Sequence, residues 1–390
     1  MKKIGLVLLL VSNFTFAQIK KGDHVPDFDF EMVNTSKKTI KLSSLKGKLV
    51  WLEFWATWCG ACIEAMPHVV ALQQKYKDQL QVIAVGNEPV ERIAQFLKVK
   101  PIDLSFAVDT AELLKKYFPY RLIPHSVLIG ADGKLVSYSN TEQITVKVID
   151  SLLKGQQVHL EDKKDNFSTD YVRDYFYADD KIKHRVLWQA QIKGAGGMLF
   201  SHFDNPAFSG RRLTFINVSL SSIFREAFGD FPYGRTIDSL GTLAEGVFCL
   251  DIIVDKKSKL HETLKRALAE KYKVDAKIQK QTKEVFVLSI VDPPKFAQVK
   301  RNTDGSRSYF ARHGAIDQKG ITLADFATFL ESFGSLRKLV IDESGNTELL
   351  DLKFNFQPEN KDILLKILAD MGLGLTPAIR TVDVLSLKHQ

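Results

Sequence analysis

A strand-length apolar run leads directly into two closely spaced cysteines, and few folds accommodate this combination. Residues 49–54 are apolar apart from Glu53, and Cys59 and Cys62 follow with two residues between them. A short apolar run is typical of a buried strand, and the apolar spacing over 63–76 is that of a helix. The cysteine pair is therefore predicted to lie where a buried strand passes into a helix, as in α/β layer architectures.

Residues 20–155 continue this alternation of short strands and amphipathic helices. The further elements predicted there are a strand over 81–85, a hairpin whose strands 126–129 and 135–138 flank the turn 131–134, and a closing helix over 141–153. This order predicts an α/β domain with a central mixed sheet flanked by helices.

The N-terminus has the pattern of an export signal. Lys2 and Lys3 precede an apolar stretch over 4–11, and small or neutral residues lead to Ala17. A positively charged start, a short apolar stretch and a small-residue cleavage point are typical of a secretory signal peptide. The sequence therefore predicts a cleaved signal over residues 1–17 and a periplasmic or otherwise extracytoplasmic protein. An uncleaved anchor is the alternative.

The rest of the chain is predicted to be a linker followed by a duplicated α+β region. Residues 156–184 are the predicted linker, because their central part is rich in Asp, Lys and Asn and poor in aliphatic residues. Residues 185–292 and 293–390 then share an order of helices and strands at an offset of roughly 100 residues, a length that suits a small α+β unit. The matching helices are predicted over 220–228 and 260–272 in the first copy, and over 323–330 and 363–371 in the second.

Charge and cysteine content narrow the classes of function. The formal net charge is +8, but Lys and Arg are interleaved with Asp and Glu, so no nucleic-acid partner is expected. Behind the predicted signal the chain has three cysteines, Cys59, Cys62 and Cys249. An exported protein that used cysteine for stability would usually carry several disulfides, so the close pair indicates chemistry. Cys249 lies in an apolar run and is predicted to be a buried, inert thiol, with a resolving or intermolecular role as the alternative.

Two kinds of site contain cysteines separated by two residues: a redox dithiol and half of a zinc site. A zinc site needs two further Cys or His ligands, but the nine His residues are scattered and there is no second cysteine pair. The redox interpretation is favoured, with no metal and no cofactor beyond the Cys59–Cys62 disulfide. A helix N-terminus favours a thiolate. Cys59 is therefore predicted to attack a substrate disulfide, and Cys62 to resolve the mixed disulfide.

The segment from Glu53 to Cys62, followed by Met66-Pro67, resembles the TlpA/ResA branch of thioredoxin-like proteins. The other landmarks are Leu42–Gly47, Val108-Asp109, Ile123-Pro124 and Leu128–Gly133, so the resemblance covers residues 22–154. It implies a thioredoxin-like fold and an extracytoplasmic disulfide reductase, sometimes one that serves cytochrome c maturation. The implied partners are disulfide-containing exported proteins and a membrane electron-donor protein.

The resemblance also implies roles for individual residues. Pro124 matches the family's cis-proline, which would leave the backbone of Ile123 free to pair with an extended substrate; an ordinary loop proline is the alternative. Glu53 matches the buried acid of thioredoxins. A carboxylate desolvated there would have a raised pKa and could take the proton from Cys62. The alternative for Glu53 is a strand residue paired with a lysine such as Lys48.

Some positions depart from the family pattern or leave two interpretations open. Many relatives carry a Glu where this chain has Ala65, and Glu64 would face another way, so neither is assigned a role. His125 replaces the small or hydroxyl residue usual after the cis-proline, and it is predicted either to tune Cys59 or the substrate groove or to face solvent. Trp58 is predicted to be partly exposed as a flat contact for substrate.

Residues 185–390 resemble, by pattern alone, an uncharacterised family that is abundant in soil bacteria. The pattern includes Leu213–Phe228, Gly320–Leu330 and Leu373–Leu385, and no catalytic signature accompanies it. The sequence as a whole therefore predicts an exported protein-disulfide reductase acting on envelope proteins. The alternative is an envelope interaction protein, whose thioredoxin-like part targets partners while its repeats bind an unknown ligand. A thiol peroxidase is disfavoured, because the Pro-x-x-x-Thr-x-x-Cys arrangement of peroxiredoxins is lacking.

Overall fold

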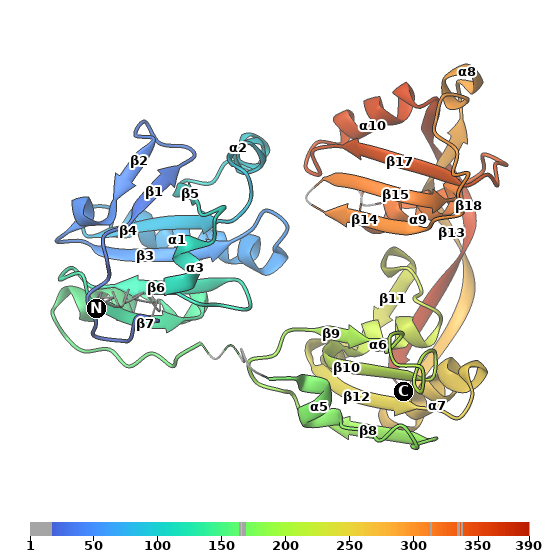
Figure 1. Ribbon diagram of the computed structural model, residues 1–390, viewed down its shortest axis with the longest axis horizontal. Coiled ribbons are helices and arrows are strands. Elements are labelled where there is room, and N and C mark those ends of the chain that lie inside the picture. The colour runs from blue at the N-terminus through green and yellow to red at the C-terminus, as the bar shows by residue number, and fades with distance from the viewer. Residues whose placement is uncertain are drawn as a thin grey trace, which may run out of the picture. The chain divides into compact units, whose positions relative to one another are not determined.

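The computed structural model describes residues 18–389 except 164, 166–168, 313, 334, 335 and 337. The predicted signal peptide, residues 1–17, lies outside the described residues. The chain divides into two compact units, Met1–Lys163 and Lys164–Gln390, which are coloured from blue to green and from green to red in Figure 1. Within the described part of the chain, no helix is long and apolar enough to cross a membrane.

The first unit is built on one mixed sheet of seven strands in the order β2-β1-β5-β4-β3-β6-β7. Its strands are β1 (Asp29–Met32), β2 (Thr39–Lys41), β3 (Leu49–Trp55), β4 (Leu80–Gly86), β5 (Ser105–Val108), β6 (His125–Ile129) and β7 (Leu135–Ser139); its helices are α1 (Gly60–Lys75), α2 (Val90–Val99), α3 (Leu113–Tyr117) and α4 (Val146–Leu153). Strand β3 is parallel to β4 and antiparallel to β6. The predicted α/β fold with a central mixed sheet is confirmed.

The alternation of side chains along β3 separates the two faces of the sheet. Trp51 and Trp55 lie in the core on the face covered by α1, α2 and α4, whereas Leu52 and Phe54 lie in the core on the other face, next to α3. Since successive side chains of a strand point to opposite faces, Glu53 belongs to the α1 face. The carboxyl group of Glu53 therefore lies in the apolar layer between the sheet and the helices that include α1, which starts at the cysteine pair.

The predicted linker, residues 156–184, is wrong at both ends. At its start, Leu160 is buried in the core of the first unit, and the Lys163 N–H donates to the carbonyl of Tyr138 at 3.0 Å. At its other end lies helix α5 (Tyr171–Phe176), whose two terminal aromatic residues are buried in a cluster with Ile216 and Cys249. The few apolar residues in this charged segment are the ones that pack, and composition averaged over the segment conceals them.

The second unit contains the same order of elements twice. After β8 (Arg185–Gln189), the first copy runs β9 (Met198–Phe200), β10 (Arg212–Ser219), α6 (Leu220–Ala227), β11 (Thr236–Ser239), β12 (Val247–Ile253), α7 (Leu260–Tyr272) and β13 (Val274–Ile290). After α8 (Pro293–Phe296), the second copy runs β14 (Ser308–Arg312), β15 (Ala315–Ile321), α9 (Leu323–Phe333), β16 (Leu339–Asp342), β17 (Leu350–Asn355), α10 (Lys361–Asp370) and β18 (Leu373–His389). The predicted duplicated α+β pattern is present.

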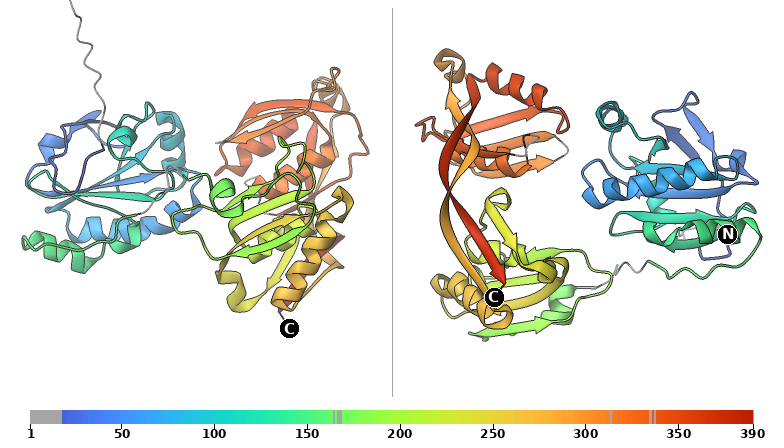
Figure 2. Two further views of the ribbon diagram at one scale, coloured as in Figure 1. Left: turned by 60° about the horizontal axis from the view of Figure 1, so that its bottom comes forward. Right: turned by 180° about the vertical axis from the view of Figure 1, so that it is seen from behind.

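The two copies exchange their last strands, which the sequence analysis did not predict. Strands β13 and β18 pair antiparallel over their whole length, from Val274↔His389 to Ile290↔Leu373, and form the long twisted ladder seen in Figures 1 and 2. Strand β18 also pairs with β11 of the first copy, and β13 with β16 of the second.

The exchange continues into the cores of the second unit. Leu385 and Leu387 of β18 are buried in the core that contains α6 and α7, while Leu288 of β13 is buried in the core that contains α9 and α10. The predicted boundary between 292 and 293 therefore separates the copies along the sequence but not in space, because each core is completed by a strand of the other copy.

Candidate active site

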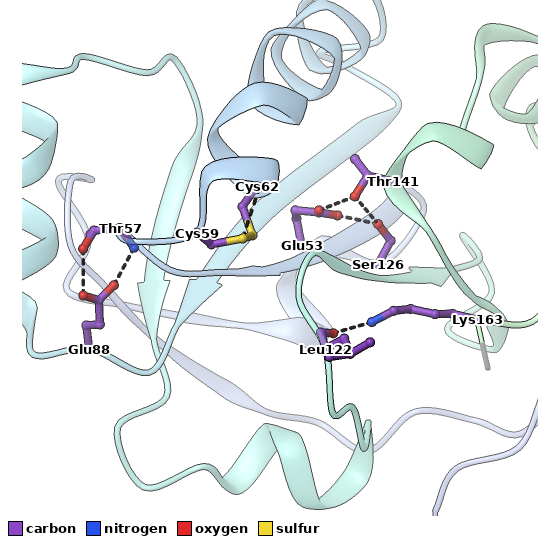
Figure 3. The surroundings of a disulfide bond; sticks show 9 residues. All are labelled: Glu53, Thr57, Cys59, Cys62, Glu88, Leu122, Ser126, Thr141 and Lys163. Atoms are coloured by element: carbon purple, nitrogen blue, oxygen red, sulfur yellow. Dashed lines mark hydrogen bonds between the residues drawn. A yellow bond between two sulfur atoms is a disulfide. The ribbon is translucent and has the colours of Figure 1, made fainter. Parts of the chain in front are cut away.

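Cys59 and Cys62 form a disulfide at the N-terminus of α1 (Figure 3). Cys59 is the N-cap residue, and its Sγ accepts a hydrogen bond from the N–H of Cys62 at 3.1 Å. Cys59 is 7% exposed, Cys62 is 1% exposed, and the neighbouring Trp58 is 54% exposed. The two cysteines are thus unequally exposed: Cys59 keeps a small exposed surface beside the exposed Trp58, while Cys62 is almost fully enclosed.

The loop that leads into the cysteine pair is held by Glu88, a residue that the sequence analysis missed. The buried Glu88 carboxylate accepts hydrogen bonds from the N–H and the Oγ1 of Thr57, at 2.6 and 2.7 Å. The Arg92 Nε lies 3.9 Å from the same carboxylate. Glu88 could have been proposed from its position two residues beyond an apolar strand, since the carboxyl ends of neighbouring parallel strands lie side by side.

The predicted cis peptide bond is present between Ile123 and Pro124. It immediately precedes β6, whose first residue pairs with Phe54 near the end of β3. The proline therefore lies at the edge of the sheet from which the chain continues to Cys59. Ile123 is half-buried and packs against the cores on both faces of the sheet.

Glu53 is fully buried and is surrounded by hydrogen-bond donors from three elements. Its carboxylate accepts hydrogen bonds from Trp51 Nε1 at 2.9 Å, from Thr141 Oγ1 at 2.6 Å and from the hydroxyl of Ser126. Burial raises the pKa of Glu53, and these donors together with the charge of Lys163 oppose that rise. The alternative partner Lys48 is half-buried and bonds elsewhere, with its Nζ 3.5 Å from the carbonyl of Lys77.

His125 does not lie where either sequence interpretation placed it. The side chain is 2% exposed, so it does not face solvent. Its ring stacks on Tyr120 and Tyr138, with centroids 5.3 and 5.9 Å away, and lies near Phe54. Because Phe54 belongs to the face opposite α1, His125 is an aromatic core residue there, and the predicted contact with substrate is not supported.

The other positions considered in the sequence analysis lie partly at the surface and partly in the core. Glu64 is exposed on α1 and Ala65 is half-buried, so the carboxylate that many relatives carry at the second position has no counterpart there. Cys249 is buried in β12, where its thiol donates to Asn217 Oδ1 at 3.2 Å. Cys249 thus behaves as the predicted buried thiol of the second unit.

Each unit matches a different family model. Residues 20–153 match the model described as Redoxin, and residues 251–389 match the model described as Protein of unknown function (DUF3738). The second match begins inside β12, whereas the duplicated pattern begins at β9 and is therefore longer than the matched segment.

Several curated proteins are similar to the first unit. The thiol-disulfide oxidoreductase ResA of Bacillus subtilis is 30% identical over 34% of this chain and 80% of its own length. That of Bacillus cereus is 37% identical over 31% of this chain and 70% of its own length. The exposed lipoprotein thioredoxin Etrx1 of Streptococcus pneumoniae, a solved structure, is 27% identical over 33% of this chain and 99% of that chain, with a TM-score of 0.30.

The Redoxin match, residues 20–153, includes the strand, helix and cysteine pair from which the site is built. Cys59 and Cys62 are in disulfide-bonding distance at a helix N-terminus, with a cis-proline close by in the sheet. This arrangement supports thiol–disulfide exchange as the chemistry of the first unit. The chain belongs to the ResA family of thioredoxin-like thiol–disulfide oxidoreductases.

Proposed function

We propose that the protein is an exported reductase that reduces the disulfides of envelope proteins. The observation that carries this proposal is the unequal exposure of the two cysteines, of which Cys59 retains more exposed surface, next to the exposed Trp58. An accessible sulfur suits the first attack on a substrate, and an enclosed sulfur suits an attack that comes from within the protein. The signal-like N-terminus supports an extracytoplasmic location.

The proposed reaction begins with the reduced protein. The Cys59 thiolate attacks one sulfur of the substrate disulfide, which forms a Cys59–substrate bond and releases the other substrate sulfur as a thiolate. Glu53 then takes the proton from Cys62, whose sulfur attacks Cys59 Sγ and displaces the second substrate thiolate. Both substrate thiolates take up protons, so the substrate gains two electrons and two protons while the protein forms the Cys59–Cys62 disulfide.

The proposed partners follow from this stoichiometry. Each turnover leaves the protein oxidised, so a dithiol donor must reduce it again, and on the outer side of a membrane that donor is a membrane protein with access to electrons. The substrate backbone is proposed to pair with Ile123 next to Pro124, with Trp58 as the flat contact at the entrance.

Cysteine substitutions in the purified mature chain test the order of attack. Cys59→Ser is expected to abolish the reduction of insulin disulfides, because the accessible nucleophile is lost. Cys62→Ser is expected to accumulate mixed disulfides, detected as a mass increase that dithiothreitol reverses. Cys249→Ser is the matched control and keeps full turnover. Full turnover by the Cys59→Ser protein refutes the mechanism.

The direction of exchange is tested by the reduction potential of the pair, measured by equilibration with glutathione or dithiothreitol followed by thiol trapping. A reductase is expected to lie near the thioredoxin value of roughly −270 mV. A value toward roughly −120 mV is that of an oxidant that donates disulfides, and it contradicts the proposed direction.

A further inference from the structure

Strand β8 forms one edge of the sheet β8-β12-β10-β9 in the second unit, as Figure 1 shows. It pairs with β12 in a continuous register from Arg185↔Ile253 to Gln189↔Cys249. Among the described residues, no strand pairs with its outer side. In an antiparallel pair, alternate residues direct their N–H and C=O groups away from the partner strand. The outer side of β8 therefore presents backbone groups that a further strand could bind.

Natural edge strands usually have a feature that prevents pairing with another chain, such as short length, a lysine, a proline or a bulge. The opposite edge of the same sheet is β9, which has three residues. Strand β8 has five residues and contains neither lysine nor proline. Its one charged side chain, Arg185, is bonded to the buried Asp251, with Nε 2.9 Å from Oδ2. Strand β8 is thus the less protected edge of this sheet.

A groove of about 340 Å³ lies between β8 and helix α7. Val186 and Trp188 line its strand side, and Val186 is 37% exposed. Leu187, between them, packs on the other face in the cluster that contains α5. An extended peptide can bind such a site by adding a strand to the exposed edge and placing alternate side chains in the space beside it. The further residues that line the groove are His184, Thr263, Arg266, Ala267, Glu270 and Lys271.

The residues of α7 that form the base of the groove are small. Thr263 and Ala267 are buried and lie four positions apart, so they share one face of the helix. Arg266 and Glu270, which also line the groove, are exposed. A peptide backbone can therefore approach the helix over small side chains, while its own side chains meet charged groups at the rim.

The charged residues of the groove are two cations, Arg266 and Lys271, and one carboxylate, Glu270. The Lys271 ammonium lies 4.9 Å from the centre of the Trp188 ring. None of the three forms an ion pair with a described residue. Cations without a carboxylate partner can bind a carboxylate of a ligand, so the charge of the groove favours an acidic peptide over a basic one.

We propose that the groove between β8 and α7 binds an extended, acidic segment of another protein, which is added to the sheet as a strand beside β8. The backbone of the segment pairs with the outer side of β8, its apolar side chains contact Val186 and Trp188, and one of its carboxylates binds Arg266. No cysteine takes part. The second unit thereby has a peptide-binding function that is separate from disulfide exchange.

The test measures the binding of a fluorescein-labelled peptide to the full mature chain by fluorescence anisotropy. In the probe peptide, threonine alternates with valine or glutamate, so that all valines and glutamates lie on one face of an extended strand. This peptide is expected to bind, and its affinity is expected to fall as salt is added. The same peptide with lysine in place of every glutamate is expected to bind roughly ten-fold more weakly.

Backbone methylation separates strand addition from the attraction of charges alone. Methyl groups on alternate backbone nitrogens remove the N–H donors from one side of the peptide strand and leave its charge unchanged. Two such peptides are compared, one methylated at the threonines and the other at the valines and glutamates. Because the glutamate face must lie toward α7, only one of these sets of N–H groups can face β8. One methylated peptide is therefore expected to lose binding while the other retains it.

Charge reversal locates the site. Arg266→Glu changes an exposed residue without an ion-pair partner among the described residues, so the fold is expected to persist, as circular dichroism checks. Its affinity for the acidic peptide is expected to be roughly ten-fold lower, since a weak attraction becomes a repulsion of similar size. Arg266→Gln is expected to lose less. Lys319→Glu reverses an exposed charge on β15, outside the groove, and is expected to match wild type.

Other outcomes overturn the inference. Absence of binding by the acidic peptide refutes it, as does equal binding of the lysine peptide. If the two methylated peptides bind equally well, or if both fail to bind, the proposed pairing with β8 is contradicted. Wild-type affinity in Arg266→Glu, or an equal loss in Lys319→Glu, shows that the peptide does not bind in this groove.

Discussion

Glu53 is a buried acid in β3, where the neighbouring residues are all apolar. Its burial is tolerated because Trp51, Ser126 and Thr141 supply donors to both carboxylate oxygens. A buried polar group without partners would cost on the order of 1–3 kcal/mol. The site therefore combines a desolvated carboxyl group, which is a better proton acceptor than an exposed one, with enough hydrogen bonds to keep it in place.

Replacement of Glu53 by Gln is expected to slow the resolution of mixed disulfides by about 100-fold, the lower range for loss of a general base. The attack of Cys59 on substrate is expected to change little, since that sulfur is activated by the helix N-terminus. Stopped-flow measurement of the two steps checks this. An equal loss in both steps contradicts the assignment of Glu53 to Cys62.

The same substitution is expected to change how stability depends on pH. Because burial raises the pKa of Glu53, the native protein retains a proton at pH values where the unfolded chain has lost it. The free energy of unfolding of the wild type is therefore expected to fall as pH rises from the ordinary glutamate pKa through the raised one. The Gln variant lacks this fall. Urea unfolding at a series of pH values measures the difference.

At the scale of elements, the site depends on two parallel strands ending together. Strand β3 continues into Thr57 and the cysteine pair, while the chain beyond β4 supplies Glu88, so that one carboxylate fixes the start of α1. We call this contact between Glu88 and Thr57 the Glu88 clamp. It explains how a loop with an exposed tryptophan can still hold Cys59 in one orientation.

Glu88→Ala is expected to destabilise the protein by about 2 kcal/mol, because the N–H and hydroxyl of Thr57 lose their acceptor. A displaced loop is also expected to slow the attack of Cys59, since misplaced reacting atoms cost up to about 100-fold in rate. Glu91→Ala, at an exposed position in the first turn of α2, is the matched control. If the two variants are equally stable in chemical denaturation, the proposed stabilising role of the Glu88 clamp is contradicted.

At the scale of the whole chain, the second unit is one folding unit made from two exchanged copies. Removal of β18 would leave β11 without its strand partner and take Leu385 and Leu387 out of the first core. A chain of residues 169–292 is therefore expected to lack cooperative unfolding, whereas residues 169–389 are expected to unfold in a sharp transition followed by circular dichroism. A sharp transition of the shorter chain contradicts the exchange.

The first unit and its reactive cysteine pair could be predicted from sequence because they produce patterns among residues that are close together in the chain. The apolar runs of β3 and β4, the helical spacing of α1 and the Cys-x-x-Cys spacing are properties of neighbouring residues, and the structure confirms them. The cis bond before Pro124 followed from a family resemblance. The duplicated pattern was visible for the same reason, since each copy repeats its own local periodicity.

Only the tertiary structure decided which residues far apart in the chain contact one another. The face on which His125 lies, the contact of Glu88 with Thr57 and the return of Lys163 to Leu122 depend on strand order and packing. The exchange of β13 and β18 is of the same kind, because either strand could satisfy its hydrogen bonds within its own copy. Sequence by itself determined the strands and helices around the cysteine pair and where the dithiol lies, but it missed α5 in the charged segment 156–184. Pairing between distant segments selected the partners, because local periodicity specifies which side chains are to be buried but not what buries them.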